Sequence, residues 1–291
     1  MSGYSPWTED YLHESVLDYI ALGLALFGSA CGGNGAPADN ERPIRDGNVL
    51  YTNVTGGWVF KTSSTGSSTT PSRIQEIFAY LDNSSTNSGG KTIAGVVHVI
   101  GCMDVSSGSV MTDVPVRGTL DLSGNAKLTS DPVQGNVFEF TMQFSSSRAT
   151  GTYTVSGNGC ASGAAGGLTD GVKAARLTGT WKGYVNVETA PMLKFKTDFA
   201  QTNSPDAKGY YHLSGTMDFF DDPCFSRATV DPENTWVAGG GYLAKLTTSN
   251  GDIWLSGVLH EPVSNAQNDF GYQVAGGSCN GVSNWGIMLH D

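Results

Sequence analysis

Histidine and cysteine are the residue types in this chain that most readily bind metals or act as nucleophiles. The five histidines are His13, His98, His212, His260 and His290. None stands in the H-x-x-x-H or H-E-x-x-H spacing that places two zinc ligands on one helical face. The chain also lacks a G-x-S-x-G nucleophile elbow and a phosphate-binding P-loop. We therefore expect no enzymatic activity, no cofactor and no metal site, with a hydrolase that gathers dispersed histidines as the alternative.

Two other clusters of side chains could bind a ligand without catalysing a reaction. Carboxylate oxygens suit calcium, and five acidic residues stand close together in the second half of the chain: Asp218, Asp221, Asp222, Asp231 and Glu233. Three aromatic residues, Trp236, Tyr242 and Trp254, could form an exposed platform for sugars. An acidic turn and a buried core are the simpler interpretations of the two clusters, and we favour them.

The five cysteines indicate disulfides rather than a metal or redox motif. They are Cys31, Cys102, Cys160, Cys224 and Cys279. None falls in a C-x-x-C, so zinc ribbons, thioredoxin-like motifs and c-type haem attachment lack their spacing. Because the count is odd and Cys31 stands far from the others, we separate it from the remaining four.

The N-terminal segment has the pattern of an export signal. Residues 19–30 form an uncharged apolar run that is too short for a transmembrane helix but suits a secretory signal. Residues 28–31 resemble a bacterial lipobox, in which Cys31 would be acylated, although Gly28 stands where leucine is usual and residues 1–18 contain no Lys or Arg. We expect a signal-like segment over 1–30 and a flexible Gly-rich tether over 31–47. A short buried or amphipathic helix with an incidental cysteine is the alternative.

The rest of the chain contains two copies of one unit. Three landmarks recur in the same order: Gly56-Gly57-Trp58 with Gly179-Thr180-Trp181, Ile93–Val96 with Leu213–Thr216, and Tyr153–Cys160 with Tyr272–Cys279. Each copy carries a pair of cysteines, which predicts the disulfides Cys102–Cys160 and Cys224–Cys279 and an oxidising compartment. Four buried free thiols are the alternative. We place the two units at residues 48–168 and 176–291.

Alternating apolar and polar residues predict antiparallel strands in both units. Phe138, Phe140, Met142 and Phe144 share one face, and Glu139, Thr141 and Gln143 share the other. The expected fold is all-β, with two tandem up-and-down meander units of about 7–8 strands, closed as small barrels or half-barrels. Trp58 and Trp181 would be structural residues at the head of each unit.

One segment is ambiguous between helix and strand. Ile74, Ile77, Phe78 and Leu81 have helical spacing after Pro71. The corresponding segment of the second unit, in which Phe199-Ala200 aligns with Phe78-Ala79, alternates as a strand. We favour a strand because tertiary context often overrides a short local pattern.

The Gly-x-Trp motif resembles the signature of the lipocalin (calycin) family, in which the Trp packs across one end of an up-and-down barrel. Further motifs stand at Leu177–Trp181, Leu213–Phe219, Pro223–Phe225 and Phe270–Cys279. With the lipobox and tether, the pattern looks like a group of tandem-repeat bacterial lipoproteins of unassigned function. This resemblance implies a fold and a location, and no catalytic residues. Lipocalins place an arginine on the last strand to meet the Trp, and residues 284–291 contain none.

Charge and composition restrict the possible functions. A net charge of -11 argues against nucleic-acid binding, which requires a basic face. We expect an exported, lipid-anchored protein of the cell envelope or surface, with a non-enzymatic binding or structural role. A lipocalin-like binder of a small apolar ligand or glycan is one alternative, and a self-assembling extracellular subunit is another. The expected partners are the membrane, through the lipid anchor, and such a ligand or second copy.

Overall fold

The computed structural model consists of β-strands joined by turns. It describes residues 43–46, 49–64, 74, 76–84, 90–104, 109–159, 161–186, 193–220, 222–259 and 267–290. Within these ranges the helical element is a single 3-10 turn, η2 (Pro232–Asn234), so this part of the chain has no helix that could span a membrane.

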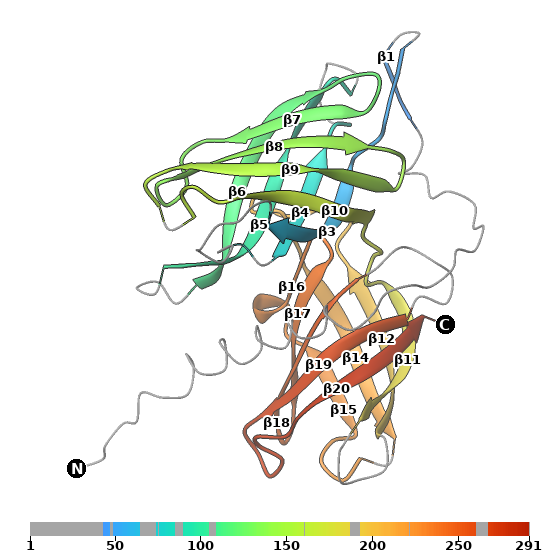
Figure 1. Ribbon diagram of the computed structural model, residues 1–291. Helices are drawn as coiled ribbons and strands as arrows, with labels where there is room; N and C mark the ends of the chain where they lie inside the picture. The colour runs from blue at the N-terminus through green and yellow to red at the C-terminus, as the bar shows by residue number, and fades with distance from the viewer. Residues whose placement is uncertain are drawn as a thin grey trace.

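The first unit is a closed eight-stranded barrel in which each strand pairs with the next and the last returns to the first (Figure 1). Its strands are β3 (Gly56–Ser64), β4 (Glu76–Asp82), β5 (Thr92–Asp104), β6 (Ser109–Leu120), β7 (Asn125–Ser130), β8 (Asn136–Phe144), β9 (Arg148–Gly157) and β10 (Ala165–Lys173). A short hairpin of β1 (Ile44–Asp46) and β2 (Val49–Tyr51) precedes it. All pairings are antiparallel, as the alternation predicted.

The second unit is also an eight-stranded barrel, in which two strands are interrupted. Its strands are β11 (Gly179–Asn186), β12 (Leu193–Gln201), β13 (Tyr210–Tyr211), β14 (Leu213–Phe220), β15 (Arg227–Val230), β16 (Trp236–Ala238), β17 (Gly241–Thr248), β18 (Gly251–Val258), β19 (Gln267–Ala275) and β20 (Ser283–His290). β13 and β14 form one strand broken at His212, and η2 separates β15 from β16. Pairing of β20 with β11 closes the barrel. The prediction of two tandem antiparallel barrels is therefore confirmed.

The repeated landmarks occupy equivalent places in the two barrels. Trp58 and Trp181 are each the third residue of the first strand. Tyr153 on β9 and Tyr272 on β19 are both buried in the seventh strand. Strand register corrects one detail of the predicted alignment. Gly56 pairs with Leu81 and Gly179 pairs with Phe199, so the residue equivalent to Phe199 is Leu81 and not Phe78.

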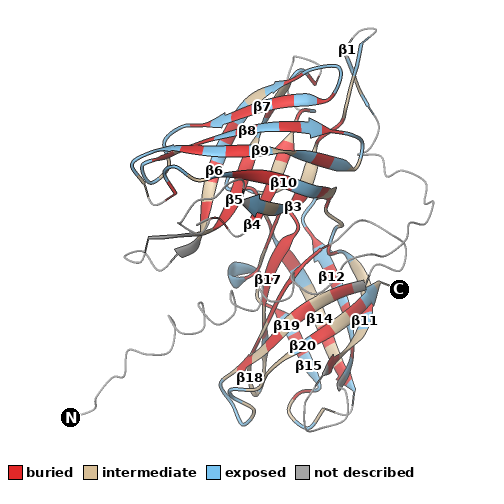
Figure 2. Ribbon diagram, viewed as in Figure 1, coloured by how far each residue is buried: buried red, intermediate tan, exposed pale blue. Residues whose placement is uncertain are grey.

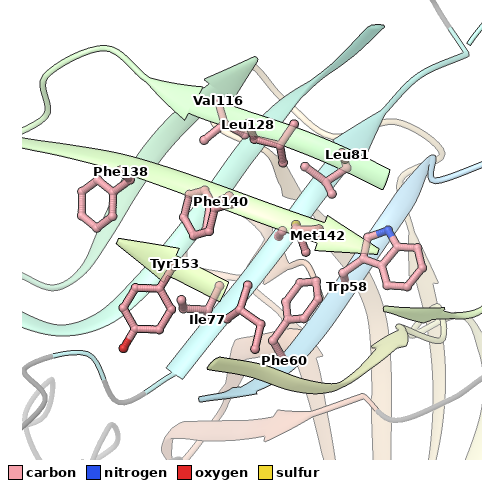
Figure 3. Close-up of a cluster of buried hydrophobic side chains, with 14 of the residues drawn as sticks. Trp58, Phe60, Ile77, Leu81, Val116, Leu128, Phe138, Phe140, Met142 and Tyr153 are labelled. Atoms are coloured by element: carbon pink, nitrogen blue, oxygen red, sulfur yellow. The ribbon is translucent and has the colours of Figure 1, made fainter. Parts of the chain in front are cut away.

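The interior of the first barrel is filled by side chains from alternate strand positions. Figure 3 shows Trp58, Phe60, Phe138, Phe140 and Met142 converging between the strands. On β8 the predicted inward residues are buried and the residues between them are exposed, as the alternating bands of Figure 2 show. This alternation buries a continuous apolar core and leaves a solvated outer face.

The outer wall of the first barrel departs from this alternation where the second barrel meets it. Residues 76–79 on β4 and 96–100 on β5 are buried at every position. The outward side chains Val59, Phe78 and Ile100 form an apolar cluster with Val258 of the second barrel. Burial on both faces explains why the segment around Phe78 imitates a helical pattern, and the predicted strand is confirmed as β4.

A run of three glycines lets the two barrels approach closely. Gly239 and Gly240 form the turn between β16 and β17, and Gly241 begins β17; this turn lies at the junction of the barrels in Figure 1. Gly239 has a φ of +56°, and a Cβ there would lie 2.7 Å from the backbone nitrogen of Ala79. A side chain at Gly57 would collide with the Gly239 carbonyl group. The sequence motif that marks the first strand is thus also a contact site for the second barrel.

We predict that Gly57→Thr, which introduces the residue found at the equivalent Thr180, separates the barrels locally. The added side chain must displace the Gly239 turn, so we expect a loss of roughly 1–3 kcal/mol of stability. Faster amide hydrogen exchange at residues 239–241 would measure the effect. Thr180→Gly is the matched control and should leave that exchange unchanged, and unaltered exchange in Gly57→Thr would contradict the prediction.

Candidate functional site

Each barrel begins with the same hydrogen-bonded network around its first strand. In the first barrel the Asn83 backbone nitrogen donates to Thr55 Oγ1 at 3.2 Å, and Asn83 Oδ1 accepts from the Val54 nitrogen at 3.1 Å. Asn83 Nδ2 also donates to the carbonyl oxygens of Thr52 at 2.9 Å and Gly90 at 3.2 Å. Both the oxygen and the nitrogen of this fully buried side-chain amide therefore form hydrogen bonds.

The second barrel repeats the network with Thr178, Gln201 and Leu177. The Gln201 nitrogen donates to Thr178 Oγ1 at 3.1 Å, and Gln201 Oε1 accepts from the Leu177 nitrogen at 2.8 Å. Sequence reasoning missed Asn83 and Gln201 because neither lies within a recognisable repeat. The amides hold the chain at the entry to the barrel, so the predicted structural tryptophans start from equivalent backbone positions.

Both the indole nitrogen and the ring of Trp58 have partners in the first barrel. Its Nε1 donates to the Val54 carbonyl oxygen at 2.8 Å. Lys173, on the last strand β10, places its Nζ 5.7 Å from the centre of the Trp58 ring and donates to the Asn53 carbonyl oxygen at 3.1 Å. The ammonium group over the indole face is a cation–π contact. Lys173 thus takes the place that the lipocalin resemblance assigns to an arginine.

Trp181 has a last-strand partner but no hydrogen bond. The ring of His290 on β20 meets the Trp181 ring edge-on, with the centroids 4.8 Å apart. His290 Nε2 also lies 3.1 Å from the Thr178 carbonyl oxygen. The Trp181 Nε1 is buried without a hydrogen-bond partner, although Leu177 stands at the position equivalent to Val54. The two copies therefore differ at this indole.

Trp181 belongs to a set of buried polar side chains inside the second barrel that lack partners. The set comprises Trp181 Nε1, Thr197 Oγ1, Tyr242 Oη and both Nδ2 and Oδ1 of Asn268. All four residues are 2% exposed or less and lie on inward positions of β11, β12, β17 and β19. Trp181 and Thr197 pair directly across neighbouring strands. An unpaired buried polar group costs about 1–3 kcal/mol, so each of these atoms would gain from a hydrogen-bond partner. We call it the polar set.

The polar set lies toward the end of the second barrel that faces the first barrel. Tyr242 and Asn268 are the second residues of β17 and β19, and Trp181 is the third residue of β11. The first barrel covers this end, where Tyr80 packs edge-on against Tyr211 with the ring centroids 5.7 Å apart.

The first barrel serves as an internal comparison. Its described interior has no buried side-chain nitrogen or oxygen without a partner, since the two orphaned atoms of this unit belong to the outward residues Glu76 and His98. Asn136, which is also buried, accepts from the Ala161 nitrogen at 3.2 Å through its Oδ1. The two barrels, which have the same fold, thus differ in whether their buried internal polar groups have hydrogen-bond partners.

The described interior of the second barrel has no buried charged residue. The buried polar residues described in this unit are Thr197, Gln201, Thr235, Ser256 and Asn268, of which Ser256 lies on the outward face of β18. Burial, with a smaller effect from the charge of Asp269, raises the pKa of the Tyr242 hydroxyl, which therefore stays protonated. Asp222 lies at the opposite end, beside the disulfide, where its Oδ1 accepts from the Cys224 nitrogen at 2.7 Å. The polar set is thus a group of neutral donors and acceptors.

A second polar cluster joins the barrels at their interface. His98 Nδ1 lies 3.0 Å from Asp113 Oδ1, and the Tyr210 hydroxyl donates to the same oxygen at 2.5 Å. The rings of His98 and Tyr210 stack with centroids 4.9 Å apart. Burial acts to raise the pKa of Asp113, but the hydrogen bonds from His98 and Tyr210 outweigh it and hold that pKa below its usual value. The cluster links strands β5 and β6 to β13.

Of the histidines considered for dispersed catalysis, the structure describes His98 and His212. His98 is fully buried at the barrel interface, and its Nε2 has no partner. His212 lies on the surface, 3.6 Å from Asp206. His260 and His13 lie outside the described residues.

The disulfide Cys224–Cys279 is confirmed, with the two Cα atoms 6.2 Å apart. It ties the entry of β15 to the end of β19, and Asn250 Nδ2 donates to Ser278 Oγ beside it at 2.7 Å. Cys31 and Cys160 lie outside the described residues, as does the side chain of Cys102, so lipidation and the first disulfide stay predictions.

The acidic cluster is dispersed among separate contacts. Asp218 pairs with Arg227 at 3.5 Å, whereas Asp231 accepts from the Glu233 nitrogen at 3.1 Å as the cap of η2. Asp221 lies outside the described residues, and in the rest of the described chain no three His, Cys, Asp or Glu side chains gather as metal ligands would.

The three aromatic residues do not form one platform. Tyr242 is buried in the core, Trp254 lies under Lys245 with 5.8 Å between Nζ and the ring centre, and Trp236 packs against Tyr210. The core interpretation therefore holds for Tyr242, whose hydroxyl belongs to the polar set.

Comparison with known proteins assigns no family. No family model matches the sequence, and no curated protein matches it. A crystal structure of a protein of unknown function from the DUF3598 family of Nostoc punctiforme is similar at 10% sequence identity, with a TM-score of 0.23. The alignment covers 81% of this chain and 96% of that one. At this TM-score the likeness carries no argument about function.

Glu76 is the buried acid with the strongest expected pH effect. It points outward from β4, its Oε2 is buried without a partner, and desolvation raises its pKa from 4.5 to about 8. The folded protein therefore keeps this proton at pH values where the unfolded chain releases it. Stability falls as the pH rises from about 4.5 to 8, by roughly 3–5 kcal/mol in total.

We predict that Glu76→Gln removes this loss, because glutamine keeps a neutral side chain of the same shape. Urea unfolding should show the variant more stable than the natural protein at pH 8.5 and similar to it at pH 4.5. Glu139→Gln, at an exposed position on β8, is the matched control and should follow the natural protein at both pH values. Equal stability of Glu76→Gln and the natural protein at pH 8.5 would show that Glu76 is not a buried neutral acid.

Proposed function

We propose that this protein is an exported, non-enzymatic binding protein, anchored to a bacterial membrane through Cys31, that holds a small molecule inside its second barrel. The polar set carries the proposal. Five buried atoms on four inward side chains of the second barrel lack partners, whereas the described interior of the first barrel leaves none. Binding sites combine apolar walls with a few such polar groups.

The side chains around the polar set are apolar. Phe195 and Phe270 meet edge-on in the second barrel with centroids 5.6 Å apart, and Phe199 and Met217 are buried in the same core. The end near the polar set is covered by the first barrel, so a bound group there would be removed from water. Low local polarity strengthens hydrogen bonds to a guest. The first barrel then acts as a packed support and cover.

Export and anchoring rest on the sequence. The apolar run at 19–30, the lipobox-like residues 28–31 and the Gly-rich tether precede the barrels, and the disulfide Cys224–Cys279 is consistent with an oxidising compartment.

Self-association is a second candidate function, favoured by one surface feature. Trp285 and Leu289, on the outer face of β20, are 48% and 47% exposed. Exposed apolar residues that cluster on one strand are typical of contact surfaces. A concentration-dependent oligomer in sedimentation would support this function, and a strict monomer at high concentration would contradict it.

We predict that the protein isolated from a bacterial envelope carries a bound small molecule. Its native mass spectrum should show an added mass that is released on denaturation. Asn268→Leu should lower the occupancy, because it removes both amide atoms of the polar set. Tyr153→Phe, which alters a buried tyrosine of the first barrel, should retain the full added mass. A spectrum with protein mass alone would argue against the proposed binding function.

We also predict that Cys31→Ser releases the protein from the membrane fraction, because serine cannot form the thioether to the lipid. Fractionation of the expressing cells and the mass of the mature N-terminal peptide are the measurements. A natural protein that is soluble and lacks a lipid mass would contradict the anchor while leaving the barrel site unaffected.

A further inference from the structure

We infer that the end of the first barrel beside the β1–β2 hairpin rests on the anionic phospholipid surface of the membrane to which the chain is anchored. We call this part of the protein the hairpin end. The inference rests on the lipid anchor of the proposed function and adds the protein surface that meets the bilayer. It does not depend on a molecule bound in the second barrel.

Exposed apolar side chains gather at the hairpin end. Val49 and Leu50 on β2 are 38% and 51% exposed, and Leu122, in the turn between β6 and β7, is 59% exposed. β2 and this turn border one open hollow of about 440 Å³, whose lining includes Tyr51, Leu120 and Leu122. A group of large exposed apolar side chains is typical of a surface that contacts a protein or a membrane.

Two basic side chains stand beside the apolar ones. Lys91 and Lys127 line the same hollow, and both are exposed. No ion pair between described residues involves either lysine. Apolar side chains beside lysines match the interface of a bilayer, because the lysine stems can lie along the lipid while their ammonium groups meet anionic head groups.

The acidic residues at this end have local partners. The Asp121 carboxylate accepts hydrogen bonds from two backbone nitrogens of its own turn, each at 2.8 Å. Asp82 Oδ1 accepts from the Ser84 nitrogen at 2.7 Å. Within the hairpin, Arg45 and Asp46 balance each other in charge. The two lysines are therefore the charges that this end can present to an anionic surface.

The tether places the hairpin end near the lipid. Residues 32–42 separate Cys31 from Pro43, and the hairpin follows directly. A Gly-rich chain of this length has a root-mean-square span of roughly 20 Å. Figure 1 shows β1 beyond the first barrel, on the side away from the second barrel. A short tether raises the local concentration of the hairpin end at the bilayer to the millimolar range, so individually weak contacts suffice to orient the protein.

The equivalent turn of the second barrel is already a contact surface. The β6–β7 turn joins the fourth and fifth strands of the first barrel, as the Gly239-Gly240 turn does in the second. That glycine turn packs against the first barrel, where a Cβ on Gly239 would lie 2.7 Å from the Ala79 nitrogen. In the first barrel the same turn carries the exposed Leu122. The first copy thus exposes a surface that the second copy uses for docking.

The test uses the lipidated full chain, purified from the envelope and reconstituted into vesicles of phosphatidylcholine with phosphatidylglycerol. Amide hydrogen exchange on the vesicles is compared with that of the Cys31→Ser chain in buffer. Residues 49–51 and 121–124 should exchange at least about 5-fold more slowly on the vesicles, since each lysine near an anionic surface shifts the docking equilibrium by about that factor. Residues 283–290 of β20 should exchange equally in both, and vesicles of pure phosphatidylcholine should remove most of the protection.

Variants of exposed side chains locate the contact without unfolding the barrel. Leu122→Ser removes an apolar side chain, and the double variant Lys91→Gln with Lys127→Gln removes both charges. Each should lower the protection of residues 49–51 about 5-fold. Leu289→Ser is the matched control, because it replaces a leucine that is 47% exposed on the second barrel. It should leave the protection unchanged.

The outcomes separate this surface from the anchor. A protein that carries a lipid mass but shows no protection at residues 49–51 and 121–124 would overturn the inferred surface and leave the anchor in place. Protection of β20 in their stead, protection that survives the lysine double variant, or protection that grows with protein density in the vesicles would also overturn it; the last result would indicate a second copy of the chain as the partner. A protein without a lipid mass would overturn both the anchor and the inference.

Discussion

Backbone atoms of Gly57 and Gly239 approach so closely that no side chain fits between them, and this contact sets the distance at which the two barrels meet. Other features of the interface depend on it. The outward side chains of β4 and β5 become a second core with Val258, Tyr80 reaches Tyr211, and the Asp113 carboxylate comes within reach of the Tyr210 hydroxyl. The covered end of the second barrel, where the polar set lies, follows from the same geometry.

The two barrels share the same strand arrangement and equivalent backbone contacts, and they differ in their interiors. The amides of Asn83 and Gln201 hold equivalent backbone segments, and the seventh strands carry equivalent tyrosines. The first copy then uses its polar groups internally, as the bond from Trp58 to Val54 shows. The second copy leaves the corresponding indole of Trp181 without a partner. One copy is specialised for packing, and the other keeps hydrogen-bonding capacity.

Much of the fold could be predicted from the sequence, because period-two alternation and repeated landmarks report local structure directly. The strands around Phe140 and the disulfide Cys224–Cys279 are examples. The helix-like pattern at Ile74–Leu81 was ambiguous because it reflects a contact with the second barrel. Lys173 and His290 could not be predicted as the partners of the tryptophans, because the family resemblance implies an arginine at that position. The polar set could not be foreseen, since the absence of a partner for Asn268 or Thr197 is a property of three-dimensional neighbours.

Closure of each barrel joins the two ends of its own sequence. Trp58 on β3 pairs with Lys173 on β10, and Trp181 on β11 pairs with His290 on β20. Contacts this distant along the chain form slowly, because a long loop must be ordered before the pairing is gained. Each unit therefore stays open until its last strand has been synthesised. If the chain is exported unfolded, as we propose, late closure would keep the polypeptide open during translocation and delay the assembly of each barrel until translocation is complete.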